Sequence, residues 1–246
     1  MIMAASYLCS VAAFSDARSE TITEKAMQNV LLLIVDDLRP NINAYGHTFM
    51  STPNIDKFAK SGTTFTNAYA QIASCGPSRN SFMTGRRPQT TKAVTFSNHF
   101  RQVGDDWSSM PQYFRTQGFY TFGTGKVYHA RMPPNFDAAK SWDEMVYPGD
   151  KYYEDSEKMG IMPTASGGQV AWVDAAGDFE GTEVEGSNTL IYEDLKLTQD
   201  EQIRDATLAF LDRAAANPAR PFFAAVGFKK PHLEFQVRRL DTICTR

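Results

Sequence analysis

Runs of apolar residues alternate along the chain with stretches of helical periodicity. Residues 29–35, NVLLLIV, form a continuous apolar run of strand length, which is typical of a strand buried on both faces of a parallel sheet. Residues 119–126 and 220–228 predict two further strands, and the alternating pattern of residues 63–70 predicts a fourth. Because helices separate these strands, the pattern predicts an α/β fold with a mainly parallel central sheet and helices on both faces.

Four helices are predicted from capping residues and periodicity. The first spans residues 52–62, with Pro at its first turn, and the second runs over residues 75–85 to a glycine that can end it. Residues 108–118 predict a third helix. The fourth, residues 198–217, begins with a capping box of Thr and Glu. Its apolar face consists of Ile203, Ala206, Phe210, Leu211 and Ala214.

Two segments lack a clear pattern of this kind. Residues 141–197 show no sustained period and are rich in Gly, Tyr, Asp and Glu, which predicts a long irregular surface insertion. Residues 1–28 contain a short apolar stretch and small residues but no positive n-region. A signal peptide and a plain leader both remain open for that segment.

Composition excludes two classes of protein. The chain has 246 residues, a net charge of -3 and no sustained basic stripe, so no nucleic-acid partner is expected. No apolar run approaches the roughly 18 residues that a membrane span needs. Cys9, Cys75 and Cys244 are far apart, which argues against a disulfide framework and against a paired-cysteine zinc site.

A set of polar and reactive residues follows the predicted strand ends or begins the second helix. In an open parallel sheet, ligands bind beyond the carboxyl ends of the strands. Each residue alone has an ordinary structural explanation, such as a turn-capping Asp or a solvated Lys. Convergence on one sheet edge predicts a functional site instead, with Cys75 as a nucleophilic thiol beside Arg79 and a helix N-terminus. The set is Asp36, Asp37, Cys75, Arg79, Lys126, His129 and His232.

The motifs around these residues resemble a known family. CGPSR at residues 75–79 and TGRRP at 84–88, with NVLLLIVDDLRP, STPNIDKFAKSGTTFTNAYAQ, GTGKVYH and FFAAVGFKKPH, resemble the type I sulfatases, most closely their iduronate-2-sulfatase branch. The resemblance covers residues 29–235 and is weakest across 141–197. It implies a truncated alkaline-phosphatase-like sandwich, with 29–235 as the N-terminal part of the catalytic domain and 236–246 as a divergent tail.

The resemblance implies that Cys75 does not act as a thiol. In that family a formylglycine-generating enzyme oxidises the motif cysteine to an aldehyde, which hydrates to a geminal diol. One diol oxygen attacks the sulfur of a sulfate ester while the alcohol leaves, and the second hydroxyl then expels sulfate. By the same analogy His129 deprotonates that hydroxyl, and His232 contacts the sulfate or protonates the leaving oxygen. The implied substrate is a 2-sulfated uronic acid or another sulfated sugar.

The resemblance also implies a metal site and an anion site. A calcium ion would lie between Asp36, Asp37 and the formylglycine oxygens at Cys75, bound through hard oxygen ligands. Arg79 and Lys126 would hold the diol and the sulfate by charge-assisted hydrogen bonds.

Two departures from the family leave the function open. Family members are much longer, with further metal ligands and a sulfate-binding Lys in their later half, and the resemblance stops after Phe235. We therefore expect an impaired sulfatase with exposed sheet edges and apolar faces. The alternatives are a phosphonate or phosphate ester hydrolase that uses the same aldehyde, and a non-catalytic fragment that binds sulfated glycans or a homologue. The expected location is secreted, lysosomal or periplasmic.

Overall fold

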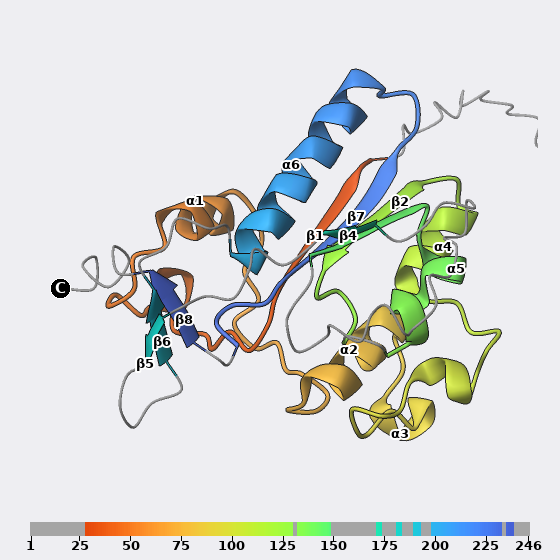
Figure 1. Cartoon of the computed structure of the whole chain (residues 1–246), viewed down its shortest axis with the longest axis horizontal. Coiled ribbons are helices and arrows are strands. Elements are labelled where there is room, and N and C mark those ends of the chain that lie inside the picture. Colours follow the sequence, from red (N-terminus) through yellow and green to blue (C-terminus); the bar gives the residue numbers. More distant parts are fainter. Residues whose placement is uncertain are drawn as a thin grey trace, which may run out of the picture.

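The central element of the fold is a five-stranded parallel sheet in the order β1-β7-β2-β3-β4 (Figure 1). The computed structural model describes residues 28–129, 132–148, 171–173, 181–183, 189–192, 198–232 and 235–238. The predicted α/β class with a parallel central sheet is confirmed. The strands of this sheet are β1 (Val30–Val35), β2 (Tyr120–Gly125), β3 (Glu144–Pro148), β4 (Ala171–Val173) and β7 (Phe222–Phe228).

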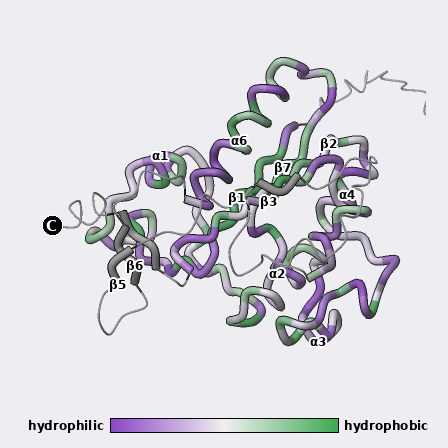
Figure 2. Tube along the Cα trace, in the orientation of Figure 1, coloured by the Kyte–Doolittle hydropathy of each residue, from purple (hydrophilic) through white to green (hydrophobic). Residues whose placement is uncertain are grey.

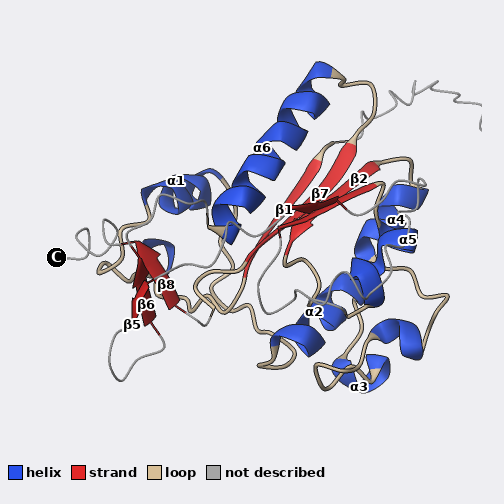
Figure 3. Cartoon of the chain, in the orientation of Figure 1, coloured by secondary structure: helices blue, strands red, loops and turns tan. Residues whose placement is uncertain are grey.

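Helices cover both faces of this sheet (Figure 3). Helix α6 (Gln199–Ala216) packs on one face, and α4 (Met110–Thr116) packs on the other with α5 (Ala138–Ser141) beside it. Helix α2 (Cys75–Thr84) lies beyond the carboxyl ends of the strands. None of the helices in the described ranges is long and apolar enough to cross a membrane. The remaining helices are η1 (Asn43–Tyr45), α1 (Pro53–Ser61), α3 (Pro88–Thr91), η2 (Phe100–Gln102) and η3 (Pro134–Asp137).

The predicted helix ends are confirmed where local chemistry decides them. At the start of α6 the Thr198 hydroxyl accepts from the Glu201 backbone N–H at 3.3 Å, and the Glu201 carboxylate accepts from the Thr198 N–H at 2.7 Å. Gly85 ends α2 with a φ of 64°, a left-handed conformation that favours glycine. Both signals act within a few residues, so the sequence alone was sufficient to find them.

The core consists of aromatic stacks on either side of β7. Phe223 faces α4, where its ring centroid lies 4.5 Å from that of Phe114. Its neighbour Ala224 faces α6, in a cluster where the rings of Phe122 and Phe210 stack 4.2 Å apart. Figure 2 shows the apolar residues concentrated along the central strands. Alternate residues of β7 thus pack into two separate layers, as expected for a strand buried on both faces.

The prediction that residues 29–35 are buried on both faces was wrong. Strand β1 pairs with β7 and lies at one end of the sheet order, with alternating half-buried and exposed residues. Leu31, Leu33 and Val35 are 43%, 54% and 40% exposed. Helix α6 packs against β2, β3 and β7, so it does not cover this face of β1.

Two further predictions were wrong. Residues 63–70 form no strand, and Phe65 and Tyr69 within them are 72% and 83% exposed, because this alternating segment has no sheet to pair with. The stretch 141–197 is not irregular throughout, because β3 belongs to the central sheet and buries Met145 and Tyr147. Its short length and mixed composition hid the strand.

A small second sheet contains two strands of that stretch and one strand from later in the chain, whereas β4 belongs to the central sheet. Its order is β5-β6-β8, in which β5 and β6 are antiparallel and β6 and β8 are parallel. It lies near α1, apart from the central sheet (Figure 1). Residues 1–27 and 239–246, most of the predicted leader and tail, lie outside the described residues. The strands are β5 (Gly181–Glu183), β6 (Thr189–Tyr192) and β8 (Phe235–Arg238).

Candidate active site

The predicted site residues follow the carboxyl ends of three adjacent strands. Asp36 follows β1 and continues its ladder, because its N–H donates to the Phe228 carbonyl at 3.1 Å. Lys126 follows β2, and its N–H donates to the Gly227 carbonyl at 2.7 Å. His232 follows β7, so the predicted convergence on this edge is present for these three residues.

Two glycines allow the ends of β2 and β7 to approach closely. Gly125 has a φ of 67°, and a Cβ placed on it would lie 2.3 Å from the carbonyl oxygen of Gly227. A Cβ on Gly227 would lie 2.1 Å from the carbonyl carbon of Lys126. Side chains at either position would separate the strands, so these glycines fix the place of Lys126.

A buried ion triad lies at the centre of the site. Arg79 Nη2 donates to Asp36 Oδ1 at 2.7 Å, and Lys126 Nζ donates to Asp36 Oδ2. The Asp36 and Arg79 side chains are each 4% exposed, and that of Lys126 is 9% exposed. Arg79 Nη1 also donates to the carbonyls of Lys126 and Val127, the latter at 3.1 Å. The triad joins β1, α2 and the segment after β2.

The charges of this triad favour binding of an anion. Burial by itself raises the pKa of Asp36, but Arg79 and Lys126 outweigh it, so its pKa lies below the ordinary value of 3.8. Asp36 is therefore ionised near neutral pH. Two cations against one carboxylate leave a net positive charge in a poorly solvated place, which attracts a sulfate or phosphate group.

Helix α2 presents Cys75 as its first residue, with a partly exposed thiol. Asn80 fixes this turn, because its amide donates to the Gly76 carbonyl at 2.9 Å and its Oδ1 accepts from the Phe100 N–H at 3.0 Å. A Cβ on Gly76 would lie 3.6 Å from His129, an ordinary contact distance, so the segment after β2 packs against the start of the helix. His129 thus lies against Gly76, the residue that follows Cys75.

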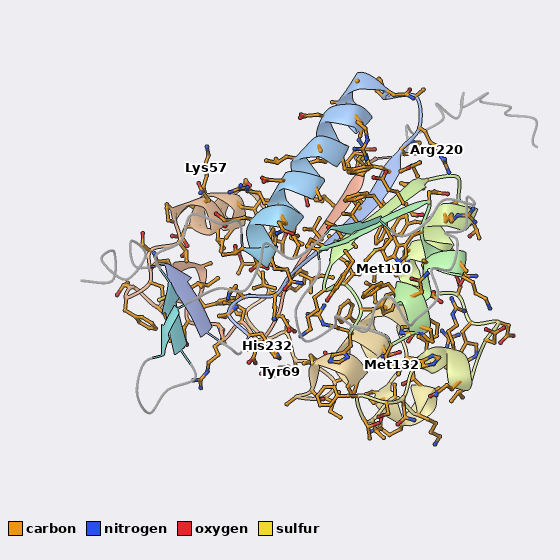
Figure 4. The ribbon with its side chains drawn as sticks, in the orientation of Figure 1. Lys57, Tyr69, Met110, Met132, Arg220 and His232 are labelled. Carbon is orange, nitrogen blue, oxygen red and sulfur yellow. The ribbon has the colours of Figure 1, made fainter. Side chains whose placement is uncertain are left out.

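His232 and Asp37 complete the predicted set. His232 Nε2 lies 3.9 Å from Asp36 Oδ2, and Figure 4 shows His232 at the opposite end of β7 from Arg220. Asp37 is exposed and has a φ of 59°, a conformation that Asp tolerates better than most residues. Both line an open pocket of about 490 Å³ together with Asp36, Cys75 and Arg79. Lys126 and His129 lie behind this lining, against Asp36 and Gly76.

Sequence reasoning missed two residues of the site. Phe96 lines the pocket, and its ring centroid lies 5.0 Å from that of His129. Asp200, in the first turn of α6, accepts hydrogen bonds from the loop that carries His232. No sequence signal marked Phe96, and an acidic residue at a helix start is common for electrostatic reasons alone.

The residues present fit only part of a metal site. Asp36 and Asp37 offer hard carboxylate oxygens, but both oxygens of Asp36 accept from cationic side chains. Within the described ranges, no three His, Cys, Asp or Glu side chains are grouped closely enough to hold a metal ion. A calcium ion takes six to eight oxygens, so two carboxylates would bind it weakly.

Comparison with known proteins defines the class. A protein solved in complex with its substrate D-glucosamine-2-N,6-O-disulfate superposes with a TM-score of 0.54 at 21% identity, over 84% of this chain and 35% of that one. The phosphonate monoester hydrolase of Agrobacterium radiobacter gives 0.57 at 19% identity, over 87% of this chain and 43% of that one. The chain thus shares the fold of these two proteins, which confirms the predicted fold class.

The sequence matches narrow this class to one family. The model of the Sulfatase family matches residues 28–241, so the chain belongs to the sulfatase family. Human iduronate 2-sulfatase is 36% identical over 230 residues, which are 92% of this chain and 38% of that protein. The predicted resemblance is confirmed, and the chain spans less than half of that relative. Sulfatases generally use a formylglycine and a divalent metal ion.

Proposed function

We propose that this chain carries part of the reaction centre of a sulfuric ester hydrolase that acts on sulfated sugars, with 2-sulfated uronic acid as the first candidate substrate. The observation that carries this proposal is the position of Cys75 in one pocket with Asp36 and Arg79, whose ion triad is completed by Lys126 behind the pocket lining. Family membership and similarity to iduronate 2-sulfatase support the substrate class. Residues 29–235 would form the N-terminal part of the catalytic domain.

Each site residue has a role that suits its place. Formylglycine, derived from Cys75, would supply a hydrated aldehyde as a nucleophile toward sulfur. Arg79, oriented by Asp36, would hold the anion by charge-assisted hydrogen bonds, and Lys126 would add positive charge behind Asp36. His129 would accept a proton near position 75, and His232 would contact the sulfate or donate a proton to the leaving oxygen.

Asp36, Asp37 and the modified Cys75 would also hold a calcium ion. Such an ion would offset negative charge on the bound ester. Asp37 is the freest of these carboxylates, because it is exposed at the pocket wall while Asp36 is already paired. The remaining ligands would lie outside the described residues, so the affinity of this chain for calcium should be weak.

The partners follow from the same chemistry. Residues 75–79 contain an intact C-x-P-S-R motif, which supports a formylglycine-generating enzyme as a partner during synthesis. The other partner is the sulfated carbohydrate. We propose that the protein is secreted or located in a lysosome or a periplasm. This location agrees with the proposed oxidation of Cys75 and with the expected leader at residues 1–28.

Two other functions remain as competing outcomes. The likeness in fold to a phosphonate monoester hydrolase supports the alternative of a phosphate or phosphonate ester hydrolase. The charge of the substrate distinguishes the two functions, because a phosphate monoester carries nearly two negative charges and a sulfate monoester carries one. The partial metal site favours a non-catalytic chain that binds sulfated glycans.

The test is expression of the chain together with a formylglycine-generating enzyme. Mass analysis of the tryptic peptide of residues 61–79 should show an aldehyde in place of the Cys75 thiol, and Cys75→Ser is the control. A peptide that retains only thiol would contradict the proposal. Turnover of an aryl sulfate, compared with aryl phosphate and phosphonate, then separates the three functions. Sulfate binding without turnover of any ester would favour the non-catalytic alternative.

A further inference from the structure

The carboxylate of Asp200 connects helix α6 to the loop after β7. Its Oδ1 accepts from the Lys229 backbone N–H at 2.7 Å, and its Oδ2 accepts from the Lys230 N–H at 3.0 Å. Both oxygens are therefore used on two consecutive backbone donors. Hydrogen bonds to an ionised acceptor are about twice as strong as neutral ones, so this contact holds the loop firmly.

These two donors precede His232, the residue that reaches the site, by three and two positions. The His232 N–H donates to the Lys229 carbonyl at 3.0 Å, which closes a tight turn on the anchored residue. From that turn the imidazole extends to the pocket, where its Nε2 lies 3.9 Å from Asp36 Oδ2. Release of the Lys229 and Lys230 amides would therefore free the backbone that orients His232.

The helix itself does not require this carboxylate as a cap. Thr198 and Glu201 already form a reciprocal capping box at the start of α6. Burial raises the pKa of Asp200, although its two backbone hydrogen bonds act in the opposite direction. A desolvated carboxylate that the helix does not need for capping indicates a role in the loop that it binds.

We infer that Asp200 is the positioning residue for His232, and that it fixes the imidazole at the sulfate side of the pocket. This inference rests on the proposed function, since it assumes that His232 contacts the bound anion. Asp200 touches no reacting atom and acts through the Lys229 and Lys230 amides. It would limit His232 to one approach toward the sulfate oxygen.

Hydrogen exchange and sulfate binding by the full chain test this inference. Asp200→Ala should raise the exchange rates of the Lys229 and Lys230 amides by about tenfold or more, and Asp200→Asn, which keeps one acceptor, should have a smaller effect. Asp200→Ala should also shift the NMR resonances of the His232 imidazole. The matched control is Asp205→Ala, because Asp205 is an exposed residue of the same helix that pairs with Arg204.

A double-mutant cycle separates positioning from simple support of the fold. Asp200→Ala should weaken inorganic sulfate binding roughly threefold to tenfold in the parent, and less than about twofold in a His232→Gln background. Equal losses in both backgrounds, or amide exchange at Lys229 and Lys230 that does not change, would overturn the inference. A parent that binds no sulfate would contradict the proposed function instead, and the exchange rates and His232 resonances would still decide the role of Asp200.

Discussion

Replacement of Asp36 by Asn should destabilise the protein more than any other single change of charge at the site. The carboxylate is 4% exposed and is the shared partner of Arg79 and Lys126. Without it, two buried cations have no counter-charge, and removal of one partner from a buried ion pair costs about 3–5 kcal/mol of the free energy of unfolding. Asp37→Asn is the matched control, because that side chain is exposed and Asn tolerates its left-handed backbone.

Urea unfolding followed by circular dichroism measures this difference. We expect the urea midpoint of Asp36→Asn to lie about 1 to 2 M below that of the parent. The free energy of unfolding of Asp37→Asn should differ from that of the parent by no more than about 0.5 kcal/mol. If Asp36→Asn does not fold, Lys126→Met replaces it in the test. This variant removes one cation and leaves Asp36 paired with Arg79, so its free energy of unfolding should fall by less. Equal midpoints for the Asp36 and Asp37 variants would refute the reasoning that the triad is a buried, coupled unit.

Three further predictions follow from the same region. Because the pKa of Asp36 in the folded protein is lowered, its charge contributes to the free energy of unfolding above pH 3.8. This contribution is lost as the pH falls through the lower pKa of the folded state. Acid titration should therefore narrow the difference in stability between the parent and Asp36→Asn. In thermal unfolding, Gly125→Ala should lower the stability of the protein more than Gly85→Ala. Both glycines have a positive φ, which costs a side chain about 1–2 kcal/mol, but of the two only Gly125 has a backbone atom within 4 Å of the added Cβ. Equal losses of stability would contradict the close approach of β2 and β7. Calorimetry should detect weak calcium binding that Asp37→Ala abolishes, and an unchanged affinity would exclude this site.

The sequence was sufficient wherever a few neighbouring residues determine the outcome. The capping box at Thr198, the glycine at the end of α2 and the apolar run of β7 all act locally, and all were predicted. The same local pattern failed for β1, because its outer face depends on where α6 lies, and α6 is set by packing against Phe122 and its neighbours.

In the site too, local features could be predicted from the sequence and long-range contacts could not. Polar residues after strand ends could be predicted to converge, because parallel strands end at one edge. The pairing of Asp36 with both Arg79 and Lys126 could not, since it joins residues 43 and 90 positions apart in the chain. The link from Asp200 to the Lys229 amide also depends on how α6 meets the end of β7. Contacts of this length leave no periodic signal in a single sequence.

The position of β7 between β1 and β2 has a consequence for synthesis of the protein. Strands β1 and β2 are made first, yet neither pairs with the other, because both bond to residues 222–228. At about 5–20 residues per second, β1 remains without its neighbour for roughly 10 to 40 seconds after it leaves the ribosome. Loop closure over such a separation makes the pairing intrinsically slow. The candidate site therefore cannot assemble progressively, and the nascent chain has an unpaired apolar strand that a chaperone can bind throughout that interval.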